Sequence, residues 1–113
     1  MTKIMKIGPE LSDEELREAE EERQETLAEH RENDPEVKEE NYVPGSFGYH
    51  EVFHTLSVVE DLFGRQVYNH RAVALDSELY AHARAVSGLI QDMYQIAGAR
   101  HLRVEDSVPS GEV

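Results

Sequence analysis

The feature that most constrains the fold is a pair of apolar patterns with helical spacing, separated by a short connection. From residue 46 to 71, apolar side chains recur every three or four positions, and the same spacing returns from 76 to 101. Such spacing places apolar groups on one face of an α-helix. Because the connection is short, the two helices should pack antiparallel. The sequence therefore predicts an all-α fold built on a two-helix hairpin.

The ends of the hairpin helices carry their own signals. Ser46 is a suitable N-cap for the first helix, and Asp76 or Ser77 for the second. Gly98 is a typical terminator, although the second helix could continue to His101 or Leu102. With the turn near residues 73–76, residue i of the first helix should face a residue of the second helix numbered about 149 − i. This register brings His50 close to residues 99–101.

The first helix of the hairpin has a second apolar strip. Val58 and Leu62 fall well away from the face that carries Val52, Phe53 and Leu56. A helix with two apolar strips usually contacts two neighbours. We therefore expect a homodimer that completes a helical bundle, with Val58 and Leu62 at the dimer interface.

A third helix should precede the hairpin. Ser12 and Glu15 match a capping box, and good helix formers continue as far as Arg31. The helix should stop at Asn33, because Pro35 disfavours helical geometry in the residue before it. The resulting domain boundaries are a flexible N-terminus at 1–11, an acidic helix at 12–33, a linker at 34–45, the hairpin core at 46–104 and a disordered tail at 105–113.

Charge limits the classes of partner. The net charge is −13 at pH 7, of which the first 46 residues carry −9, from 15 Asp and Glu against 6 Lys and Arg. Direct nucleic-acid binding and anionic membranes are disfavoured, because both need Lys and Arg. A basic protein surface is the favoured partner. The absence of cysteine excludes disulfides and thiol chemistry, and together with the lack of a long apolar run it fits a cytoplasmic protein.

One short motif points to a different function. His50-Glu51-Val52-Phe53-His54 matches H-E-x-x-H, in which two histidines one turn apart bind zinc and the glutamate acts as general base. A catalytic zinc ion needs a third protein ligand. His101 is the first choice because of the hairpin register, and Asp92 is the second. A surface or interface role for the two histidines is the simpler alternative.

The acidic helix supports the main hypothesis, which is a small non-enzymatic binding protein. Rows of carboxylates at helical spacing can imitate a phosphate backbone and occupy a basic groove. The chain would then be an adaptor, or an inhibitor of a nucleic-acid-handling protein from a phage or mobile element, with no cofactor. The predicted partner-binding residues are Glu14, Glu18, Glu21, Glu22, Glu25 and Glu29. The alternative is a zinc-dependent hydrolase using Glu51, with zinc held by His50, His54 and His101.

Overall fold

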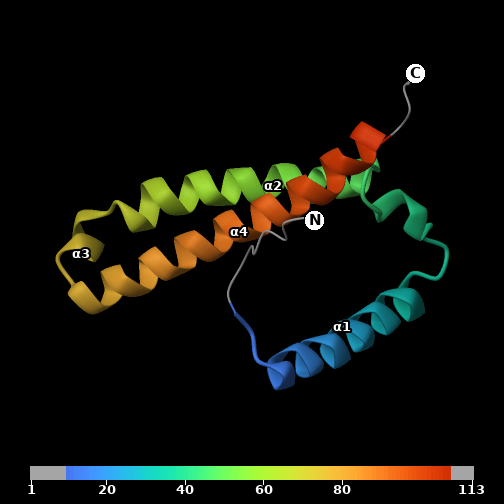
Figure 1. Cartoon of the computed structure of the whole chain (residues 1–113), viewed down its shortest axis with the longest axis horizontal. Coiled ribbons are helices and arrows are strands. Elements are labelled where there is room, and N and C mark those ends of the chain that lie inside the picture. The colour runs from blue at the N-terminus through green and yellow to red at the C-terminus, as the bar shows by residue number, and fades with distance from the viewer. Residues whose placement is uncertain (1–9, 108–113) are drawn as a thin grey trace, which may run out of the picture. The chain divides into compact units, whose positions relative to one another are not determined.

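A computed structural model describes residues 10–107, with side chains described through residue 102. Within this range the chain forms α-helices, shorter helical turns and connections, and no strand (Figure 1). The predicted all-α class is confirmed. The described residues divide into two units, 10–39 and 40–107. The predictions for residues 1–9 and 108–113 lie outside the described residues.

The first unit contains α1, Asp13–Asn33. It starts at the predicted capping box: the Ser12 hydroxyl accepts a hydrogen bond from the Glu15 amide at 3.1 Å, and the Glu15 carboxylate accepts one from the Ser12 amide at 2.9 Å. These two bonds satisfy donors that a helix start leaves open. The helix ends at Asn33, before Asp34 and Pro35, as predicted. No residue of α1 is buried.

The second unit consists mainly of two long helices. The 3-10 turn η1, Glu39–Tyr42, leads toward α2, Phe47–Phe63, which Ser46 caps through a hydrogen bond from the Tyr49 amide at 3.2 Å. A π-helical turn, η2, continues from α2 over Gly64–Tyr68. After a short helix, α3, Arg71–Ala74, the chain enters α4, Ser77–Ser107. Asp76 caps α4 by accepting the Leu79 amide at 3.0 Å, so the predicted start is confirmed.

Helices α2 and α4 lie side by side and run in opposite directions (Figure 1). Ring pairs mark their register along the whole length. Tyr68 lies 5.2 Å from Tyr80, Phe53 lies 4.9 Å from Tyr94, and His50 lies 5.4 Å from His101, measured between ring centroids. Tyr68 belongs to η2, which continues from α2, and the other two rings belong to α2 itself. As the residue number falls along this segment, the number of the α4 partner rises, which is the pattern of an antiparallel pair.

Three details of the sequence prediction were wrong. The first hairpin helix was expected to reach residue 71, but α2 ends at Phe63, and η2 and then α3 follow it. Gly98 does not end its helix, and α4 continues through residues 105–107, which were expected to belong to the tail. A Cβ at Gly98 would lie 2.9 Å from the Phe53 ring, so this glycine provides room where α2 and α4 approach each other. Close approach, and not helix termination, is the role of Gly98.

The second unit buries very little. Among the described residues, the buried apolar side chains are Val73, Ala83 and Ala97, and the buried polar side chain is His101. Two packed helices provide only one line of contact, and many large apolar side chains remain at least partly open to solvent. None of the described helices combines the length and apolar character that crossing a membrane requires.

Candidate functional site

The acidic surface of α1 contains a row of four glutamates. Glu18, Glu22, Glu25 and Glu29 follow one another at spacings of four, three and four, and all are exposed. At 3.6 residues per turn they lie within about 60° of one another and extend over roughly 17 Å. We call these four residues the glutamate row. Within the described part of the chain, the side chains of these four residues take part in no hydrogen bond or salt bridge.

Other carboxylates of α1 are already paired with arginines of the same helix. Arg17 lies 3.4 Å from both Glu14 and Glu21, and Arg23 lies 2.6 Å from Glu20. Hydrogen bonds from Arg23 and then Gln24 lower the pKa of Glu20 to about 2. Such exposed pairs contribute little to stability, but they divide the carboxylates into two sets.

This division refines the predicted partner-binding set. Of its six members, the glutamate row has no partner among residues 10–107, whereas Glu14 and Glu21 pair with Arg17. Glu20, which the prediction omitted, is the most strongly paired carboxylate of the helix, with two bonds from Arg23 at 2.6 and 2.9 Å. The sequence shows charge spacing, but the choice of rotamer decides which carboxylate an arginine takes.

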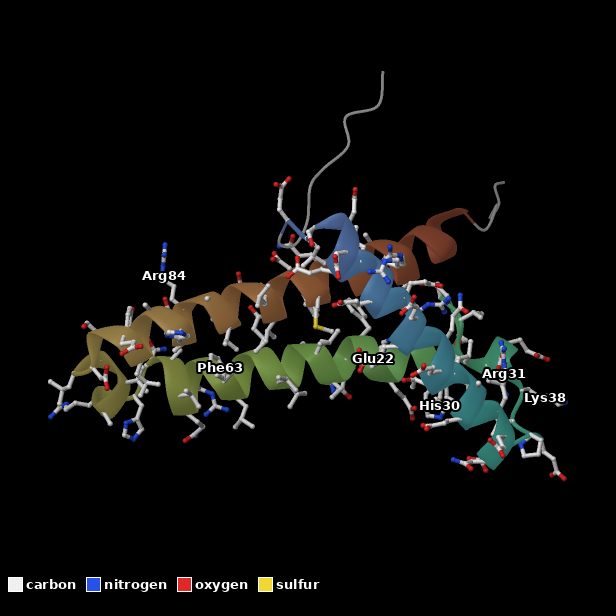
Figure 2. The ribbon with its side chains drawn as sticks, turned by 90° about the horizontal axis from the view of Figure 1, so that it is seen from below. Glu22, His30, Arg31, Lys38, Phe63 and Arg84 are labelled. Atoms are coloured by element: carbon white, nitrogen blue, oxygen red, sulfur yellow. The ribbon has the colours of Figure 1, made fainter. Side chains whose placement is uncertain are left out.

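The opposite side of α1 is weakly apolar. Leu16, Ala19 and Leu27 lie roughly 100–180° from the glutamate row, and Leu27 is the one residue of α1 that is partly covered. A shallow hollow runs along this side and reaches the edge of the row, lined by Ala19, Glu22, Arg23, Thr26, Leu27 and His30. Figure 2 labels Glu22 and His30 on this helix. A helix of this pattern can dock by one side while the glutamate row stays accessible.

The H-E-x-x-H residues lie on α2, as the motif requires. The rings of His50 and His54 are nearly parallel, with centroids 6.5 Å apart and an interplanar angle of 12°. Both histidines and Glu51 are exposed. This side of α2 also carries Asp61, whose carboxylate accepts bonds from Arg65 at 2.9 and 3.1 Å.

His101 has a different environment, because it is buried to 2% exposure. Its Nδ1 accepts a hydrogen bond from the Gly45 amide at 2.9 Å, and its ring stacks on Tyr49 with centroids 5.6 Å apart. It therefore joins α4 to the turn that precedes α2. The hairpin register predicted that His101 lies near His50. It did not predict the hydrogen bond with Gly45, because no sequence pattern indicates which backbone amide will donate to a histidine ring.

The predicted metal ligands do not form a centre. Among the described residues, no group of three or more histidine, aspartate or glutamate side chains is placed to hold a metal ion. His50 lies near His101, but the Nδ1 of His101 is already occupied by the Gly45 amide. The zinc-hydrolase alternative required three ligands around one point, and the described part of the chain does not supply them.

The predicted interface residues are accessible. Val58 and Leu62 are half exposed, at 51% and 52%. By helical rotation they lie roughly 140–180° from Phe53, on the side of α2 that is directed away from α4. Two aromatic residues near the start of α2, Tyr42 and Phe47, are also exposed. They line a hollow together with Asn41, Gly48 and Glu51.

In comparisons with known proteins, no protein-family model, curated protein or solved structure matches the chain.

Proposed function

We propose that this chain is a small non-enzymatic binding protein that engages a basic protein surface through the glutamate row of α1. The observation that supports this function is a set of four exposed carboxylates, unpaired within the described residues, on one side of a capped helix. A row of this kind offers a linear negative charge to lysines and arginines of a partner. Polyanion mimicry, and so inhibition of a nucleic-acid-handling protein, is one form of this function.

The energetic argument concerns the free helix. Glutamates four apart, such as Glu18 with Glu22 and Glu25 with Glu29, repel each other and weaken a helix by about 0.2–0.5 kcal/mol per pair. The intrahelical arginine pairs of α1 avoid these positions. Lysines and arginines of a basic partner would attract these carboxylates, and this attraction would offset their mutual repulsion in the complex.

The second unit has an assembly role in this proposal. Its long helices, α2 and α4, bury few residues by themselves, and we propose that a second copy of the chain completes a four-helix arrangement. A homodimer would present two acidic helices, so that a partner with two basic sites would bind more tightly than one with a single site.

The test compares two triple variants that change net charge equally. One replaces Glu18, Glu22 and Glu25 by Gln, and the matched control replaces Glu14, Glu20 and Glu21, which are paired in the structure. Immobilised full-length chain is used to capture proteins from an extract of the native host at low and high salt. Proteins retained by wild type and control, lost with the first variant and released by salt are the expected result. Equal capture by both variants would contradict the proposal.

A further inference from the structure

The structure gives the α2–α4 hairpin two unlike sides. On α2, Val52, Leu56 and Val59 lie about 60–120° from Phe53, whose ring stacks on Tyr94 of α4 at 4.9 Å. On α4, Val86, Leu89 and Met93 lie about 80–140° from Tyr94 in the same rotational sense. In an antiparallel pair, equal rotational sense places both sets on one side of the hairpin. We call these six residues the apolar face.

The other side of the hairpin is polar. It carries His50, His54 and Asp61 from α2, and Arg84, Gln91 and Gln95 from α4. Figure 2 shows Arg84 projecting away from α2, and Phe63 between the two helices. The polar side needs no cover, whereas the apolar face leaves Val52, Val59, Val86, Leu89 and Met93 between 40% and 57% exposed.

We propose that the apolar face is the surface through which two copies of this chain associate, face to face, as a four-helix bundle. This assignment differs from the sequence prediction, which placed the contact at Val58 and Leu62. Those two residues form a narrow strip on one helix, whereas the apolar face spans both helices. The proposed association through the apolar face does not depend on the function of α1.

The size of the face fits this occupant. Partly exposed side chains over several turns of two helices present apolar surface on the order of several hundred Å², which is as large as the largest patches found on stable monomers. A stable protein interface buries about 800 Å² per partner, so that the six residues would form its apolar centre and neighbouring residues of α2 and α4 would form its rim. Since the described residues bury only three apolar side chains, a second apolar layer is what this unit lacks.

Charge also fits a second copy. Each chain carries a net charge of −13, so that two copies repel, and the repulsion is smallest where their contact is free of carboxylates. Within residues 52–63 and 86–93, the acidic residues are Glu60, Asp61 and Asp92. By helical rotation Glu60 lies at the seam with α4, and Asp61 and Asp92 lie off the apolar face. Symmetric association would therefore bring no like charges together at the centre.

The experiment is light scattering on the full-length chain with two neighbouring substitutions. Wild type should show twice the 12.9 kDa chain mass. Val59→Lys places a charge at the centre of the apolar face, and should raise the dimer dissociation constant at least about 100-fold, because each dimer buries two lysines. Val58→Lys is the matched control. It changes the same residue type at a more exposed neighbouring position, 51% against 40%, and should leave the mass unchanged.

A second variant protects the test against misfolding. Met93→Lys changes α4 at a position that is 57% exposed, and should dissociate the dimer while the helical content is retained in circular dichroism. A monomeric wild type would overturn the proposal, and points to α1 or another protein as the cover of the face. Dissociation by Val58→Lys but not by Val59→Lys would also overturn it, and would place the contact at Val58 and Leu62.

Discussion

The Gly45 amide donates a hydrogen bond to Nδ1 of His101 at 2.9 Å, although the two residues are 56 positions apart. Gly45 has a φ of 91°, which favours glycine, and directly precedes the cap of α2. His101 lies toward the C-terminal end of α4. One bond therefore fixes the start of one long helix against the last turns of the other.

Replacing His101 with Phe tests this bond. The ring would still stack on Tyr49, but the Gly45 amide would lose its acceptor, which should cost about 1–3 kcal/mol of unfolding free energy. Urea denaturation measures the loss, and His82→Phe is a control because His82 is exposed and bonds only within its own helix. Equal losses in the two variants would show that the bond has no special role.

Two glycines of α4 should respond in opposite directions to Ala. At Gly88 nothing lies within 4 Å of the position that a methyl group would take, so Gly88→Ala should stabilise the helix by about 0.5–1 kcal/mol. At Gly98 the added methyl would meet the Phe53 ring at 2.9 Å, and overpacking should destabilise by about 1–3 kcal/mol. Thermal unfolding of the two variants checks the signs. Stabilisation by Gly98→Ala would mean that Phe53 moves freely.

The pairing of Glu20 predicts a pH effect in α1. Hydrogen bonds from Arg23 and Gln24 lower the pKa of Glu20 from 4.5 to about 2. Because the pKa is lower in the folded state, the ionised Glu20 stabilises the fold at pH values above about 4.5, and this contribution is lost as the pH falls toward about 2. A carboxyl NMR titration should show the pKa of Glu20 rising toward 4.5 in the Arg23→Gln variant. Arg17 pairs with Glu14 and Glu21 instead, so that the Arg17→Gln variant should leave the pKa of Glu20 unchanged. A Glu20 titration unaffected by Arg23→Gln would contradict the assignment.

Zinc should not stabilise the protein. Because no three ligands converge among the described residues, one equivalent of Zn²⁺ should shift the melting temperature by no more than about 1 °C. Differential scanning fluorimetry with and without zinc measures this, and His54→Gln serves as the control. A shift of several degrees that disappears in His54→Gln would restore the metal-binding hypothesis.

What the sequence determined by itself is local. The capping box of Ser12 and Glu15 and the caps at Ser46 and Asp76 rest on bonds between residues three positions apart, and the stop before Pro35 rests on the geometry of adjacent residues. Such interactions depend on near neighbours in the chain, and so their pattern is visible in the order of residues. The helical spacing of apolar residues was equally visible, and it indicated the all-α class.

Only the tertiary structure decided the features that depend on where two helices meet. It showed Gly98 as a point of close approach to Phe53, and it tied His101 to Gly45. Within α1, side-chain rotamers separated the glutamate row from the glutamates that pair with arginine. The contact surface that we propose includes Val59 and not Val58, because by helical rotation Val59 lies on the same side of the hairpin as the exposed apolar residues of α4. The helix contacts depend on the rotation of one helix about its axis relative to a neighbour, a quantity that packing of side chains fixes and that residue spacing leaves open.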